Sequence, residues 1–128
     1  MKPDFSGEYV LNREASTLSE IGAANVQTAG LRIDHNEPTF SCEGTFTFLS
    51  GEKANWAFEL SSDGSEEMRS EGESSIRWEG DVLVARIVTP GPTITFHYEF
   101  DRADRLRLCE ELRGSEHDQD NIWIFDRR

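Results

Sequence analysis

Histidine and cysteine, two residue types that often carry catalysis or bind metals, are few and widely separated in this sequence. His35, His97 and His117 lie far from one another, and Cys42 and Cys109 do not form a Cys-x-x-Cys pair. A side-chain nucleophile needs a base within hydrogen-bonding reach, and structural zinc needs clustered ligands. We therefore predict no catalytic residue, no metal site and no cofactor, and we expect both cysteines to be packed thiols.

Glu110 is charged, yet it follows the alternation of Leu106, Leu108 and Leu112, which marks the apolar face of a strand. A carboxylate that points into an apolar interior is costly unless it is paired. Tyr98 lies on the apolar face of the preceding run. One interpretation is that Glu110 and Tyr98 meet a hydrogen-bond donor of a ligand. The alternative is that Glu110 lies in water at a rim or is turned outward by a bulge.

Aromatic residues make up 10% of the chain, and several fall on dry strand faces. Aromatic side chains at strand spacing either fill a core or line a pocket. Both interpretations stay open for the tryptophans. The residues that we predict to contact a ligand are Phe46, Trp56, Trp78, Tyr98, Glu110 and Trp123.

Period-two alternation of apolar and polar residues runs through most of the chain and would position these side chains. This pattern predicts strands with one dry face and one wet face. Turn signals such as Ser50-Gly51 and Pro90-Gly91-Pro92 separate them. The predicted strands cover residues 5–12, 31–36, 38–49, 53–60, 65–71, 74–79, 82–88, 93–100, 105–113 and 120–127.

Most connections between these strands are too short for anything but antiparallel neighbours. An open sheet of this size would leave unpaired edges, which a closed barrel removes. We predict an all-β fold, a single domain over residues 1–128, built as a closed up-and-down antiparallel β-barrel of about ten strands (8–10). A two-sheet sandwich is the competitor, but it favours Greek-key crossings.

Residues 13–30 form the one long connection, between the first and second predicted strands. Thr17 precedes Glu20 by three residues, which is the spacing of a capping box, and Gly22 would end a helix after one or two turns. A plain loop is the alternative. Either way, we expect this segment to form a lid at one mouth of the barrel.

The charge balance limits the partners. Thirteen basic and 25 acidic residues give a formal net charge of −12, so nucleic acid and anionic membranes are poor partners. No run reaches the ~18–20 apolar residues of a membrane helix, and residues 1–5 do not resemble a signal peptide. We therefore expect a cytoplasmic protein.

Three short motifs resemble the calycins, the superfamily of lipocalins and fatty-acid-binding proteins. Phe5 to Leu11 resembles their first strand, with Tyr9 where that family has tryptophan, and the longer string Phe5 to Ser16 resembles small bacterial lipocalin-like proteins of unassigned function. Trp78 to Val84 is similar to a late hairpin of fatty-acid-binding proteins, and Ile124 to Arg127 resembles their closing strand. The resemblance implies a barrel that holds a small molecule.

Departures from the family are informative. Fatty-acid-binding proteins hold a lipid carboxylate with Arg-x-Tyr in the closing strand, where this chain has Trp123 and Phe125. The resemblance therefore does not extend to carboxylate binding. Lipocalins pack a late arginine over the first-strand tryptophan. Arg127 is similarly placed to make a cation–π contact with Tyr9, and a terminal surface arginine is the alternative.

Apolar residues also fall on the predicted outer face of two strands: Val82 and Val84 in one, and Ile122 and Ile124 in the other. Apolar patches on an outer surface indicate a covering segment or a partner. A homodimer through this face is therefore a possible assembly.

The function that these patterns favour is binding or carriage of a small, mostly apolar or neutral molecule inside the barrel. Three alternatives stay open: an isomerase-like enzyme of the calycin type, an interaction module with a solid core, and haem binding through His117. An open cavity would distinguish ligand binding from a solid core.

Overall fold

Ten antiparallel strands form one continuous sheet in the described part of the computed structural model, which covers residues 4–19, 25–61, 67–69, 72–88, 90–102, 104–114 and 118–128. The order of strands across the sheet is β4-β3-β2-β1-β10-β9-β8-β7-β6-β5. The strands are β1 (Gly7–Leu11), β2 (Val26–Asn36), β3 (Thr39–Phe48), β4 (Lys53–Ser61), β5 (Glu67–Arg69), β6 (Gly72–Glu79), β7 (Val82–Val88), β8 (Thr93–Arg102), β9 (Arg105–Arg113) and β10 (Gln119–Arg127).

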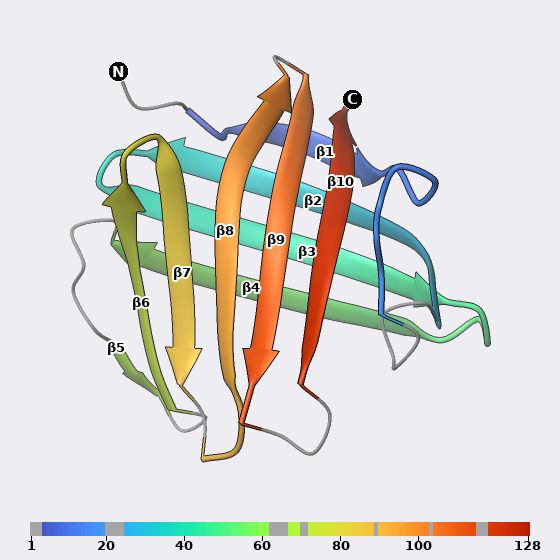
Figure 1. Ribbon diagram of the computed structural model, residues 1–128. Coiled ribbons are helices and arrows are strands. Elements are labelled where there is room, and N and C mark those ends of the chain that lie inside the picture. Colours follow the sequence, from blue (N-terminus) through green and yellow to red (C-terminus); the bar gives the residue numbers. More distant parts are fainter. Residues whose placement is uncertain are drawn as a thin grey trace.

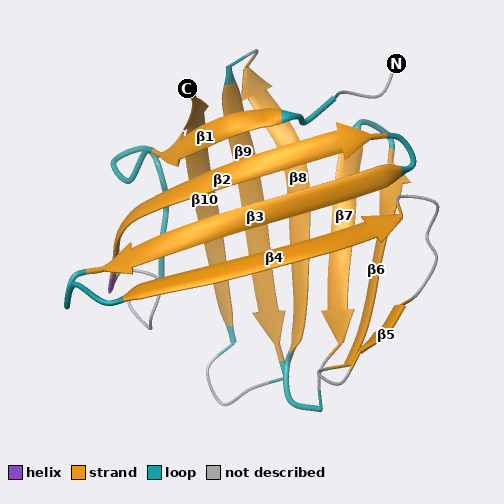
Figure 2. Cartoon of the chain, turned by 180° about the vertical axis from the view of Figure 1, so that it is seen from behind, coloured by secondary structure: helices purple, strands orange, loops and turns teal. Residues whose placement is uncertain are grey.

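The sheet folds back on itself into two crossing layers, β1 to β4 in one and β6 to β10 in the other (Figures 1 and 2). Pairing of β1 with β10 joins the layers along one side. On the other side β4 and β5 are the edges of the sheet, and β4 lies beside β6 where the sheet returns on itself. The prediction of an up-and-down antiparallel barrel of about ten strands is therefore confirmed, with a nearly closed wall.

The predicted alternation decides which side chains enter the barrel. Ile76 of β6 pairs with Ala85 of β7, and both are buried. Tyr98 of β8 pairs with Leu108 of β9, and both are again buried. The dry faces of the strands thus meet between the two layers, as the period of two requires.

The second strand begins at Val26, five residues before its predicted start. A register shift between Val26 and Thr28 explains the error, because an extra residue in a strand breaks the alternation that sequence analysis detects. Val26 and Ala29 are both buried, at odd spacing. The first connection is therefore shorter than the predicted 13–30.

Residues 12–19 of that connection run along β10. Thr17 exchanges two backbone hydrogen bonds with Ile122, at 2.8 and 2.7 Å, and the Ser16 hydroxyl accepts the Ile124 N–H at 2.8 Å. Thr17 is thus extended. Glu20 of the predicted capping box and Gly22, the predicted end of the helix, lie outside the described residues. In the described ranges, helices with the length and apolar character to cross a membrane are absent.

The first strand is fixed at its start by Tyr9 and Arg127, as the lipocalin resemblance implied. The guanidinium carbon of Arg127 lies 5.5 Å from the centre of the Tyr9 ring. Arg127 Nη2 also donates to the Tyr9 hydroxyl at 3.0 Å, and that hydroxyl donates to the Phe5 carbonyl at 2.7 Å. The cation–π contact is therefore present, and it ties the two ends of the described chain together.

Candidate functional site

A cavity of about 360 Å³ lies inside the barrel. Its volume is at the lower end of the ~300–1,000 Å³ typical of small-molecule pockets. Both layers contribute to the wall, with Phe46 and Trp56 from β3 and β4 and with Ile94, Phe96 and Trp123 from β8 and β10. Most of the lining is apolar or aromatic, so the cavity suits a ligand with an apolar body.

Five of the six residues that the sequence predicts to contact a ligand line this cavity: Phe46, Trp56, Tyr98, Glu110 and Trp123. The structure therefore brings together residues from five strands. Ligand contact itself stays a prediction for each of them.

Trp78, the sixth predicted residue, lies outside the cavity lining. Its ring stacks on Phe5 and His35, with ring centres 6.0 and 5.7 Å apart, and its indole N–H donates to Glu37 Oε1 at 2.7 Å. Trp78 is on the inward face of β6, as predicted, but it packs against the first residues of the described chain instead of a pocket.

Glu110 faces the cavity, held by two neighbours on β10. Its Oε1 accepts hydrogen bonds from Asn121 Nδ2 and from Trp123 Nε1, both at 3.0 Å. The registers of β9 with β8 and β10 are regular at this point, where Glu110 pairs with Phe96 and Asn121. No bulge turns the carboxylate outward, so Glu110 lies on the inward face of β9, half-buried in the lining of the cavity.

Sequence analysis missed Asn121, which is buried to 3% exposure. Its Oδ1 accepts the Ser19 N–H at 2.6 Å while its Nδ2 donates to Glu110. Asn121 thus links the connection after β1 to the cavity carboxylate. The signal was available in the alternation, because Asn121 shares the inward register of Trp123 and Phe125.

Gly44 was also missed, and it makes room for Trp56. The two residues are cross-strand partners in β3 and β4, and a Cβ atom at position 44 would collide with the Trp56 indole. With the glycine in place, the Trp56 ring stacks on the Phe58 ring, with ring centres 6.0 Å apart and ring planes 10° apart. A glycine on the inward face of a strand marks such a close approach.

Tyr98 lines the cavity, and the fully buried Cys42 lies beside it. Burial raises the pKa of Tyr98 well above its usual range, and the nearby Cys42 raises it further. Burial also raises the pKa of the Cys42 thiol to about 12. Both groups are therefore neutral near pH 7, and Cys42 lacks the thiolate that nucleophilic chemistry requires.

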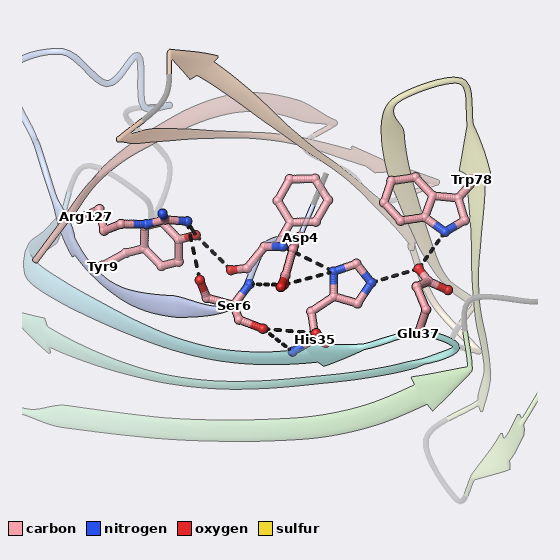
Figure 3. A network of polar contacts seen from close by, with 8 residues as sticks. Asp4, Ser6, Tyr9, His35, Glu37, Trp78 and Arg127 are labelled. Carbon is pink, nitrogen blue, oxygen red and sulfur yellow. Dashed lines mark hydrogen bonds and ion pairs between the residues drawn. The ribbon is translucent and has the colours of Figure 1, made fainter. Parts of the chain in front are cut away.

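A second polar cluster lies at the Trp78 end of the barrel (Figure 3). The Phe5 N–H donates to His35 Nδ1 at 3.2 Å, so Nδ1 is an acceptor and the ring proton is on Nε2. Nε2 donates to Glu37 Oε1 at 2.8 Å, the oxygen that also accepts from Trp78. Phe5 is fully buried, so this end is packed with side chains.

The outer face of the second layer is less open than the sequence suggested. Val84 and Ile124 are buried, at 6% and 5% exposure, and Val82 and Ile122 are half-buried. His97 on the same face bonds Glu111 at 3.0 Å. The apolar side chains that motivated a dimer are thus partly covered by the chain itself.

Solved structures with the same fold include one fluorescent protein and two proteins named for the ligands that they bind. Fluorescent protein UnaG matches with a TM-score of 0.61 over 97% of each chain, at 14% sequence identity. Fatty-acid-binding protein 1 of Echinococcus granulosus matches with a TM-score of 0.62 over 96% of each chain, at 12% identity. Zebrafish ileal bile acid-binding protein, solved with cholic acid, matches with a TM-score of 0.61 over 97% of this chain and 98% of its own, at 15% identity.

By sequence alone, the chain matches no family model and no curated protein. The likeness to solved structures therefore shows the fold alone. The chain has the fold of the fatty-acid-binding-protein-like barrels, which is the fold that the resemblance of its strand motifs implied.

Proposed function

We propose that the protein binds and carries a small, mostly apolar molecule in the cavity between its two layers. The observation that carries the proposal is the cavity of about 360 Å³ with its aromatic lining. It disfavours the interaction module with a solid core. Two barrels of the same fold are named as binding proteins, one for fatty acids and one for bile acids, which supports the proposal.

Carboxylate ligands are expected to bind weakly. Trp123 and Phe125 line the cavity at the positions where the family resemblance would place Arg and Tyr, and Glu110 adds a carboxylate of its own. A ligand acid would lose charge-assisted hydrogen bonds and meet a like charge. We therefore propose that neutral or donor-bearing apolar molecules are preferred over fatty acids.

The test is titration with an environment-sensitive apolar dye, read by dye fluorescence and by quenching of Trp56 and Trp123. Ile94→Trp adds a bulky side chain to the cavity, so dye affinity should fall at least tenfold. Thr95→Trp, at the next position on the outer face, is the matched control and should bind as wild type does. Equal binding by both variants would place the dye elsewhere and contradict the proposal.

Three finer statements also stay predictions: the likeness to small bacterial lipocalin-like proteins, a cytoplasmic location, and a homodimer through the outer face that carries Val82, Val84, Ile122 and Ile124. His117, the candidate ligand for the alternative of haem binding, lies outside the described residues. Sedimentation at two salt concentrations tests the dimer, because a net charge of −12 opposes association until salt screens it.

A further inference from the structure

Glu110 is the charged residue among the described side chains that line the cavity. The same lining contains no Lys, Arg or His. A ligand in the cavity therefore meets one negative charge, and no described side chain of the wall brings a positive charge to balance it.

The hydrogen bonds to Glu110 orient its carboxylate and leave its charge in place. Asn121 and Trp123 are both neutral donors, and both bind the same oxygen, Oε1. None of the described residues donates to Oε2. A hydrogen bond from a cation is stronger than one from a neutral donor, and it also pairs the charge of a carboxylate in an apolar cavity.

Aromatic residues flank Glu110 on both neighbouring strands. Phe96 is the cross-strand partner of Glu110, and Trp123 donates to it from the other side. The Trp123 ring stacks on Phe46 at 5.6 Å and 13°. Ring faces attract cations, as in the aromatic sites that recognise ammonium groups.

We infer that the cavity binds an amphipathic amine, with the ammonium group on Glu110 Oε2 and the apolar body against the aromatic lining. The inference rests on the proposed function and names its ligand class. A hydroxyl could also donate to Oε2, but it would leave the carboxylate charge unbalanced. The overall charge of −12 attracts the same ligands from solution.

The experiment is a calorimetric titration at pH 7 with decylamine, decanol and decanoic acid, in ~150 mM salt to screen surface charges. Wild-type protein should bind the amine at least tenfold more tightly than the alcohol, and the acid least. Because this comparison uses the wild-type chain, it does not depend on how any variant folds.

Two variants locate the charge. Glu110→Gln keeps an oxygen for Asn121 and Trp123, and it should weaken amine binding about tenfold while decanol binding stays within threefold. Glu111→Gln removes the same charge one residue away, on the outer face beside His97, and should leave the preference for the amine unchanged.

The outcomes separate the inference from the proposed function. Equal binding of amine and alcohol by wild type, or equal loss in both variants, overturns the amine inference and leaves apolar binding standing. If decanol and decylamine both fail to bind, the proposed function falls, and the inference falls with it.

Discussion

The two ends of the barrel each hold a tryptophan that donates its indole N–H to a glutamate, and the two pairs differ in what lies beside them. At one end Trp78 donates to Glu37 at 2.7 Å, and at the other Trp123 donates to Glu110 at 3.0 Å. Glu37 also accepts from His35, and the fully buried Phe5 fills the space next to it. Beside Glu110 the barrel stays hollow.

This difference shows that an aromatic–carboxylate pair does not by itself mark a binding site. In the Glu37 pair, His35 also donates to the carboxylate and Phe5 fills the adjacent space, so this end of the barrel is closed. The Glu110 pair has an oxygen without a described partner and a cavity in front of it. Tyr98 lies between the two regions. The centre of its ring is 5.2 Å from that of Phe40 and 6.4 Å from that of Phe5, and Tyr98 also lines the cavity.

The largest expected difference between the ends is in packing. Phe5→Ala should lower the free energy of unfolding by ~3–5 kcal/mol, as expected for a buried aromatic side chain. The centre of the Phe5 ring lies 5.0, 5.8 and 6.0 Å from the ring centres of Phe100, His35 and Trp78. Phe96→Ala removes an equal ring from the hollow end and should cost clearly less. Equal losses in urea unfolding would show that the two ends are packed alike.

Gly44→Ala tests how closely the cavity wall is fitted. The new methyl group meets the Trp56 ring, so Trp56 must move, at a cost of ~1–3 kcal/mol, and its fluorescence should change. Gly30→Ala is the control, since its Cβ would lie 3.7 Å from the Tyr9 carbonyl oxygen, an ordinary contact. A Gly44→Ala protein with unchanged stability and fluorescence would refute the close fit.

Two matched glutamate variants compare the pairs themselves. Glu37→Gln weakens charge-assisted bonds from His35 and Trp78, so the free energy of unfolding should fall by ~1 kcal/mol. Glu110→Gln keeps an acceptor for both of its donors and removes a charge from the cavity, so the ligand-free protein should lose no stability. Thermal melts at pH 7 measure both, and a reversed order contradicts the contrast.

The smallest effect concerns the thiols. Cys42 is fully buried and its pKa is about 12, so it should stay unmodified by iodoacetamide in the native protein up to about pH 10. Burial also raises the pKa of Cys109, but that residue is only half-buried on the outer face. Peptide mapping should therefore find Cys109 alkylated first, and comparable labelling of Cys42 would mean that the packed end opens readily.

Much of the fold could be predicted from alternation, because a strand with one dry face repeats every two residues. The inward direction of Glu110 follows from its register with Leu106 and Leu108, which the structure reproduces. The start of β2 could not be predicted, since the register shift between Val26 and Thr28 interrupts that period.

The site was predictable only in part, because alternation gives the face of a side chain and not its height in the barrel. Trp78 and Trp123 both point inward, yet one packs against Phe5 and the other lines the cavity. The bond between Trp78 and Glu37 joins residues 41 apart in the chain, which no local pattern encodes. Such contacts arise from the crossing of the two layers.

The most direct test of the central claim is a methyl NMR titration with decanol. Ligand-induced shifts should fall on Leu31, Ile87, Ile94 and Leu108, which line the cavity. The buried methyl groups outside the lining should shift little, and these belong to Ile33, Ile76, Leu83 and Leu106. Shifts that concentrate on this second set, or no shifts at saturating decanol, would contradict a ligand-binding cavity at the hollow end.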